Sequence, residues 1–298
     1  MKIGMFFFLF LAKLTMLTPM KKIIFLSFML LTAVSFGQKK EKVKGSKIVK
    51  LEQKEVGEFQ SLEVEDNLEV FLVKGNQCAL EIEADDNLIP FVDYKLAGSN
   101  LRISTSKDLS SYKKLSVRVT YNSNFNMVIA KDETNVTALS DVVLDNITFK
   151  SYDYAKLFLN AKTKNFTLMA NDKSRIELNL KSEKTAIDIS KSATVKALIS
   201  SGEMRFDMYQ KSSAEVEGDV IDLKLRLDNN TDFTGKKLTA KNGLLETAGY
   251  AKGSIMVSNI ATLDASGNSE LELYGEPVKI EVKRFADSAL LRKKPTTK

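Results

Sequence analysis

Short runs that alternate apolar and polar residues recur along most of the chain, and each run follows a small residue. The segment NDKSRIELNL, residues 171–180, shows the unit: turn-forming residues, Ser174, and then Ile176, Leu178 and Leu180 separated by polar residues. A period of two is typical of a β-strand with one buried face. Similar strings begin at residues 191, 212 and 267, which indicates an internal repeat.

The spacing of the small residues, here called anchors, gives the length of this repeat. The anchors are Thr134, Ala155, Ser174, Ala193, Ala214, Thr231, Ala251 and Ser269. Successive anchors are 21, 19, 19, 21, 17, 20 and 18 residues apart, on average about 19. The residue six positions before every anchor is apolar, and so is the residue two positions after it, except at Gly253. Each repeat is therefore expected to contain two short strands joined by a tight corner.

Such a unit has too few apolar side chains to close a core alone, so neighbouring units must stack on one another. A meander or a propeller remains an alternative, but paired strands would then be antiparallel and a repeat of about 40 residues would be expected. The shorter period favours an all-β fold, a parallel β-helix of the single-stranded β-solenoid type, with about 19 residues per coil.

The same pattern divides the chain into segments. We predict a β-helix domain over residues 48–275, with irregular first coils or a cap at 48–127 and about eight repeats at 128–275. Residues 38–47 are expected to be a charged linker. Residues 276–298 are expected to form a last strand, a short helical cap around Phe285, Ala289 and Leu290, and a basic tail.

Residues 1–37 are predicted to be a targeting segment. Lys21 and Lys22 precede an apolar stretch from Ile23 to Phe36, and Ser35 and Gly37 occupy the small positions of a cleavage site. The alternative is a membrane anchor, but this stretch is short for the roughly 30 Å of a bilayer core. We therefore expect a cleaved signal peptide starting at Met20, with Met1 as an upstream start, and no integral membrane span after cleavage.

The amino-acid composition argues against several classes of function. The chain has no His, no Trp and one Cys, Cys78, so internal disulfides are excluded and the commonest general base is absent. The formal net charge of +6 arises from the targeting segment and the tail, and the body between them is slightly acidic. Nucleic acid is not an expected partner, because binding it requires a basic stripe. The sequence contains no phosphate loop, nucleophile constellation or Cys/His cluster, and we predict no cofactor.

Three stretches carry a resemblance to a known family. They are GEFQSLEVEDNLEVFLVKGNQCALEIEADDNLIPFV from Gly57, LAGSNLRIS from Leu96 and LSVRVTY from Leu115, followed by the repeats. Over about residues 56–275 the chain resembles the head GIN domain family, described as auto-transporter adhesin heads. The resemblance implies an exported protein of the Gram-negative envelope with a right-handed β-helix and no established enzymatic activity. It supplies no catalytic residues.

One candidate ladder of chemical groups lies two positions before the anchors. Its members are Asp132, Asp153, Asp172, Lys191, Ser212, Asn229, Gly249 and Gly267. Three Asp residues on adjacent coils would stand about 5 Å apart and could hold a cation such as Ca²⁺, or contribute to catalysis. Asp, Asn, Ser and Gly are also the residues that tight corners need. The ladder thus has a turn, a cation and a catalytic interpretation, and we assign no catalytic, cofactor or metal residue to it.

The favoured function is a non-enzymatic, exported adhesion or binding module for a glycan or an envelope protein, located in the periplasm, at the outer surface or outside the cell. One alternative is a polysaccharide-acting enzyme with an acidic groove around Asp153 and Asp172. Another is a structural envelope protein that self-associates end to end. Exposed aromatic residues would support sugar binding, and Tyr152 and Tyr154 beside Asp153 are weak candidates.

Overall fold

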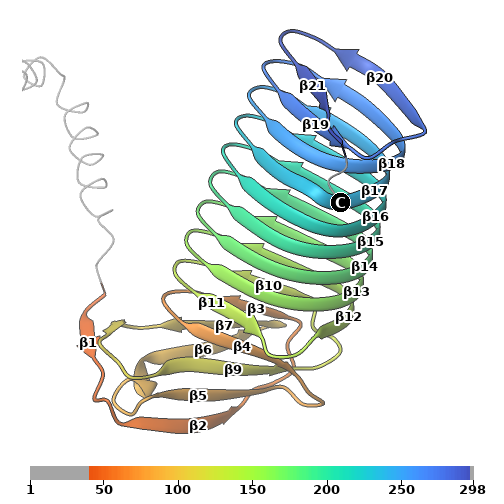
Figure 1. Cartoon of the computed structure of the whole chain (residues 1–298). Coiled ribbons are helices and arrows are strands. Elements are labelled where there is room, and N and C mark those ends of the chain that lie inside the picture. The colour runs from red at the N-terminus through yellow and green to blue at the C-terminus, as the bar shows by residue number, and fades with distance from the viewer. Residues whose placement is uncertain (1–39, 296–298) are drawn as a thin grey trace, which may run out of the picture. The chain divides into compact units, whose positions relative to one another are not determined.

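The computed structural model describes residues 40–295, and the alternating pattern forms strands along most of them (Figure 1). The chain divides into two units, Met1–Glu41 and Lys42–Lys298, and every described strand belongs to the second unit. The predicted signal peptide lies outside the described residues. The described part contains no α-helix, only one 3₁₀ turn, Ile89–Phe91, and no helix in it is long and apolar enough to cross a membrane.

A β-solenoid of about nine turns, with about 19 residues per turn, forms the body of the protein, as the repeat predicts. Its central strands pair in parallel, each with the next one along the chain. They are β12 (Val142–Ser151), β13 (Lys156–Ala170), β14 (Arg175–Ile189), β15 (Thr194–Met208), β16 (Ser213–Leu227), β17 (Asp232–Thr247) and β18 (Lys252–Ala265). Lys156 aligns with Arg175, and Arg175 with Thr194, so one coil advances 19 residues.

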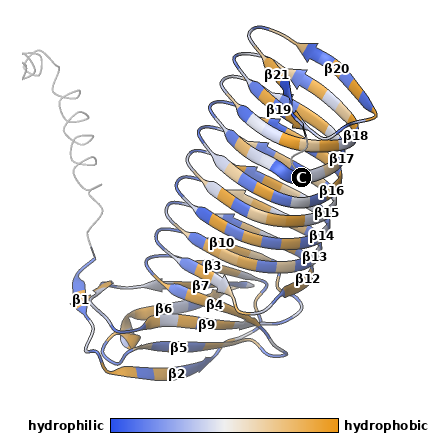
Figure 2. Cartoon of the chain, in the orientation of Figure 1, coloured by the Kyte–Doolittle hydropathy of each residue, from blue (hydrophilic) through white to orange (hydrophobic). Residues whose placement is uncertain are grey.

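Each long strand bends once and contributes to two faces. In β13 the buried residues fall at odd positions up to Ala161 and at even positions from Phe166, so a bend separates the two halves. We call residues 165–170, 184–189, 203–208 and their equivalents face A. Residues 156–162, 175–181, 194–200 and their equivalents are face B. Figure 2 shows the alternation of hydrophilic and hydrophobic residues along the coils.

The core lies between the two faces and consists of ladders of apolar side chains. Face A contributes the buried ladder Phe149, Leu168, Ile187, Phe206, Leu225, Leu245 and Leu263. The ring of Phe206 meets that of Phe233 from face B edge to face, with centroids 5.4 Å apart. Burying one such side chain contributes about 1.5–3 kcal/mol, so the stacked ladders supply the main stabilisation.

A left-handed residue forms the tight corner that precedes face B. The corner residues have φ between 53° and 72°; they are Asp132, Asp153, Asp172, Lys191, Gln210, Asn229, Gly249, Gly267 and Asp287. The residue two positions later is small and buried because it lies inside the corner, as at Ser174 and Ala193. The expected fifth anchor, Ala214, is wrong: it aligns with Val195, and Ser212 is the small residue that occupies the anchor position of Ala193. Gln210, and not Ser212, therefore belongs to the ladder of corner residues.

The order of coils at the N-terminal end differs from the order of the sequence. Strands β3 (Ser61–Val64) and β4 (Glu69–Lys74) form a coil that pairs in parallel on both sides. On one side lie β10 (Met127–Ala130) and β11 (Asn135–Ala138), and on the other β7 (Asn100–Thr105) and β9 (Leu115–Tyr121). After β4 the chain therefore leaves the stack and returns to it at β7 and β9, on the side of the β3–β4 coil that faces away from the central strands. It then crosses to the other side of that coil to form β10 and β11.

Antiparallel strands close this end of the solenoid. Strand β5 (Ala79–Asp85) pairs antiparallel with β9, and β2 (Val49–Glu55) pairs antiparallel with β5. On face A, to which β7 belongs, β6 (Val92–Ala97) pairs antiparallel with β7. Strand β1 (Lys42–Lys44) pairs with β8 (Asp108–Ser110), so part of the expected linker is a strand.

The C-terminal end continues the solenoid. Strand β19 (Glu270–Tyr274) pairs with β18, and β20 (Lys279–Phe285) and β21 (Leu290–Lys293) add a further coil. The expected helical cap around Phe285, Ala289 and Leu290 is therefore wrong, because alternation and a corner at Asp287 continue the repeat. Among the described residues nothing covers this coil, and Ile280 and Val282 remain 45% and 58% exposed.

Candidate functional site

The three Asp residues of the candidate ladder lie at corners of successive coils, and their carboxylates bind the backbone of the preceding corner. Asp132 Oδ2 accepts a hydrogen bond from the backbone N–H of Asp66 at 2.9 Å. Asp153 Oδ2 accepts one from Asp132 at 3.3 Å, and Asp172 Oδ2 accepts one from Asp153 at 3.5 Å. This use of carboxylates to satisfy turn N–H groups matches the turn interpretation.

Lys191, the next member of the ladder, supplies the counter-charge. Its Nζ donates to Asp172 Oδ1 at 2.7 Å, and this hydrogen bond lowers the pKa of Asp172. Residues 40–295 contain no group of three or more His, Cys, Asp or Glu side chains arranged to hold a metal ion. The ladder therefore brings Asp132, Asp153 and Asp172 together as a stack of corner caps.

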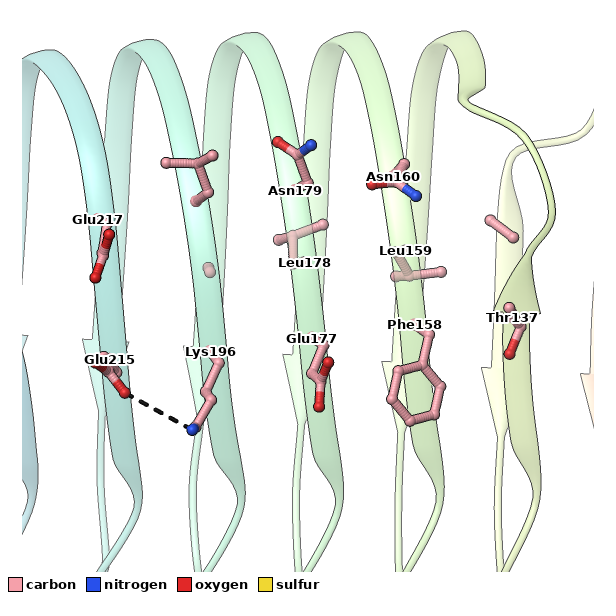
Figure 3. Close-up of a pocket in the computed structure, with 13 residues that line it drawn as sticks. Thr137, Phe158, Leu159, Asn160, Glu177, Leu178, Asn179, Lys196, Glu215 and Glu217 are labelled. Carbon is pink, nitrogen blue, oxygen red and sulfur yellow. Dashed lines mark ion pairs between the residues drawn. The ribbon is translucent and has the colours of Figure 1, made fainter.

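A shallow groove crosses face B and offers a different candidate site. It has a volume of about 670 Å³ and runs across β11 and β13 to β16, perpendicular to the strands (Figure 3). One row of outward side chains consists of aligned residues from successive strands: Thr137, Phe158, Glu177, Lys196 and Glu215. A second row consists of Asn160, Asn179, Leu198 and Glu217. Backbone groups are paired within the sheet, so these side chains determine what the groove can bind.

The groove combines an exposed ring with uncharged hydrogen-bonding groups. The Phe158 side chain is 37% exposed, and Asn160 follows it on the same face of β13. Asn179 aligns with Asn160 on the next coil, so two amides stand side by side. Each amide can both donate and accept hydrogen bonds, as a ligand rich in hydroxyl groups requires. Lys196 and Glu215 are 3.9 Å apart and neutralise each other at one end of the row.

Face A carries a charged cluster with a structural role. The Asp207 side chain is 7% exposed, and Arg205 donates hydrogen bonds to both Asp207 and Asp188. Burial raises the pKa of Asp207, and Asp188 raises it further, whereas Arg205 lowers it. The Asp207 Oδ1 atom is buried without a hydrogen-bond partner. Arg205 therefore stabilises a mostly buried carboxylate by direct contact, and Arg226, aligned with Asp207 on the next coil, also lowers the pKa of this carboxylate.

The sequence did not single out Phe158, Asn160 or Asn179. Their positions in the repeat could have indicated them. Phe158 and Asn160 stand three and five positions after the anchor Ala155, and Asn179 stands five positions after the anchor Ser174. Aligned repeats therefore stack these positions as outward rows. Of the two tyrosines considered for sugar binding, Tyr154 is exposed and Tyr152 is half-buried.

Three solved structures of similar fold come from Parabacteroides species. A "putative adhesin" from Parabacteroides merdae has a TM-score of 0.63 and 14% identity, over 85% of this chain and 99% of that one. A "putative adhesin" from Parabacteroides distasonis gives the same TM-score and identity, over 85% and 100%. A "putative lipid binding protein" from Parabacteroides distasonis has a TM-score of 0.64 and 11% identity, over 85% and 99%. At these identities the likeness shows the fold alone.

A comparison with curated proteins finds no match. The sequence pattern of one family, in contrast, matches residues 58–277, which is most of the chain and includes every strand from β3 to β19. The chain therefore belongs to the family described as "Putative auto-transporter adhesin, head GIN domain".

Proposed function

We propose that this protein is an exported, non-enzymatic adhesion protein that binds a glycan in the groove of face B. The observation that carries the proposal is the exposed Phe158 ring beside the paired amides of Asn160 and Asn179. The apolar ring fits the apolar face of a sugar, and the amides fit its hydroxyl groups. Membership of the adhesin-head family supports binding as the general activity.

Glycan binding can be tested with Phe158→Ala, measured on a glycan array and then by titration with a glycan that the array identifies. We expect the affinity to fall about tenfold, since losing a contact worth about 1.4 kcal/mol has that effect. Met169→Ala is the matched control, because Met169 is 36% exposed and Phe158 37%, but Met169 lies on face A. Equal affinities of wild type and Phe158→Ala would refute the groove as the binding site.

Export is supported by the sequence from Met20 to Gln38, with its basic start, apolar stretch and small residues before the cleavage position. The resulting location is the periplasm, the outer surface or the extracellular space. Cell fractionation of the full chain and of a variant lacking residues 20–38 tests this. We expect the variant to remain in the cytoplasm, and its normal export would contradict the proposal.

Self-assembly is a second candidate function, favoured by the open C-terminal coil. Strands β20 and β21 pair on one side with β18 and β19, and the apolar side chains of Ile280, Val282 and Phe285 are exposed. An uncovered strand edge is a template for another strand. Sedimentation velocity tests it: we expect a concentration-dependent dimer that Val282→Lys abolishes, whereas a monomer at all concentrations would exclude self-assembly.

A further inference from the structure

Cations on the surface of this solenoid commonly pair with an acid on the neighbouring coil. Lys162 lies 2.6 Å from Asp141, Lys184 lies 3.3 Å from Glu203, and Arg284 lies 2.7 Å from Asp264. Lys237 with Glu217 and Arg292 with Glu270 follow the same arrangement. Stacked coils place aligned side chains about 4.8 Å apart, so opposite charges in one row compensate each other.

Single cations such as Lys181 and Lys252 also lack an ion pair among the described residues, but three cations without one lie together on face B and its corner. Lys156 and Arg175 align directly in the pairing of β13 with β14, and Lys173 occupies the corner before Arg175. Among the described residues none of the three has an acidic side chain within ion-pair distance. Like charges on directly opposed positions of neighbouring strands repel. A sequence that keeps such a cluster loses some stability, which is typical of a functional site.

These cations line a distinct pocket of about 350 Å³. Its other lining residues are Asn67, Glu133, Asn135 and Tyr154. Lys173 Nζ lies 5.0 Å from the centre of the Tyr154 ring and 3.0 Å from its hydroxyl oxygen, so the ring and the cation are held together. With one acid against three cations, the pocket carries a formal charge of +2.

The pocket and the groove lie next to each other along the strands. Lys156, Phe158 and Asn160 are successive outward residues of β13, and Arg175 and Asn179 lie on the same face of β14. A ligand lying over Phe158 can therefore reach Lys156 without leaving face B. The groove also contains Glu177, Glu215 and Glu217, which repel a densely charged polyanion. The charge distribution thus fits a ligand with an isolated acidic group.

We propose that the basic pocket binds the carboxylate or sulfate group of an acidic saccharide whose neutral part lies in the groove. This inference rests on the proposed glycan binding and names the class of glycan. The planar guanidinium of Arg175 can donate two hydrogen bonds to the acidic group, while Lys156 and Lys173 supply point charges. The exposed Tyr154 ring offers an apolar surface to the sugar that carries this group.

The test compares binding to immobilised lactose, sialyllactose and sulfated lactose, which differ in the acidic group. One variant combines Lys156→Gln, Lys173→Gln and Arg175→Gln. We expect wild type to prefer at least one acidic probe over lactose by about tenfold, as a few partly exposed charge contacts provide, and the variant to lose this preference. The preference should also weaken in about 1 M salt, because screening reduces exposed charge interactions.

A matched control removes three cations outside the pocket: Lys181→Gln, Lys236→Gln and Lys252→Gln. This variant has the same net charge and should keep the preference. Equal loss in both variants would show that long-range electrostatics suffices, and would overturn the pocket.

The outcomes also separate this inference from the proposed function. If wild type binds lactose as tightly as both acidic probes, and Phe158→Ala abolishes this binding, the groove stands and the pocket is refuted. If wild type binds none of the three probes, the pocket inference is also refuted, because neither acidic probe is bound. A folding defect is excluded when the pocket variant melts at or above the temperature of wild type, as relief of the Lys156–Arg175 repulsion predicts.

Discussion

Replacing Arg205 with Met leaves two carboxylates without their shared cation. Arg205 bonds to Asp188 at 2.8 Å and also to Asp207, whose side chain is 7% exposed. Met keeps most of the apolar stem but removes the charge. Breaking a fully buried ion pair costs about 3–5 kcal/mol. Because Arg205 is 46% exposed, we expect a smaller loss, about 2 kcal/mol in the free energy of unfolding at pH 7.

The pH dependence identifies the cause of this loss. Burial raises the pKa of Asp207 in the folded protein above its unfolded value. A group of this kind favours the folded state below its unfolded pKa, and this contribution is lost as the pH rises through the folded pKa. Removing Arg205 raises that pKa further. The difference between variant and wild type should therefore be largest at pH 7 and shrink towards about pH 3, where Asp is mostly protonated.

Urea unfolding followed by circular dichroism at both pH values measures the effect. Arg226→Met is the control for the direct contact, because Arg226 aligns with Asp207 on the next coil and lowers its pKa, but lies 5.5 Å from the Tyr209 ring and forms no ion pair with Asp207. We expect this control to cost less than about 1 kcal/mol. A loss for Arg205→Met that is equal at pH 7 and pH 3 would refute the electrostatic explanation and assign the effect to packing of the stem.

Three further predictions concern the corner and the core. Ser174→Ala should raise the free energy of unfolding by about 1 kcal/mol in urea titration, because the Ser174 hydroxyl is buried without a partner and Ala193 fills the same position one coil away; a destabilised variant would contradict this. Phe206→Ala should lower that free energy by about 3–5 kcal/mol, since Phe206 is fully buried, and a loss below about 1 kcal/mol would show a core looser than described. Excess EDTA should leave Tm unchanged, because the Asp172 carboxylate accepts hydrogen bonds from Lys191 and from a backbone N–H and needs no cation. A lowered Tm would show that the ladder of Asp residues holds a structural cation.

The repeat was predictable because burial and crowding act on every coil in the same way. The small anchor and the apolar positions around it follow from the corner and the core, and they recur every 19 residues or so. The misplaced fifth anchor has a physical reason. Moving from Ser212 to Ala214 shifts the register by two residues, which keeps every side chain on the same face of the strand. The alternation of apolar and polar residues cannot distinguish these two registers.

The ends of the solenoid were less predictable because their pairing is set by neighbours and not by local sequence. Nothing in residues 61–74 alone indicates that their coil lies between residues 100–121 and residues 127–138. At the C-terminal end, Ala289 and Leu290 suit a helix by propensity, yet β21 forms because β19 offers a strand edge. Tertiary pairing there outweighs local preference.

The candidate sites required knowledge of which side chains stack. The Asp ladder could be found from the repeat, but the bonds from its carboxylates to the neighbouring corner could not. Phe158, Asn160 and Asn179 become a site only when two coils are in register. The basic pocket likewise depends on Lys156 and Arg175 having no acid within ion-pair distance among the described residues, which a single coil does not reveal.

Glycan binding by face B can be seen directly in a crystal structure of the protein soaked with an acidic oligosaccharide. The oligosaccharide should be one that the binding measurements select. We predict sugar density over Phe158 and between Asn160 and Asn179, with the acidic group beside Arg175. Sugar density confined to face A or to the open C-terminal coil, with face B empty, would contradict glycan binding by face B.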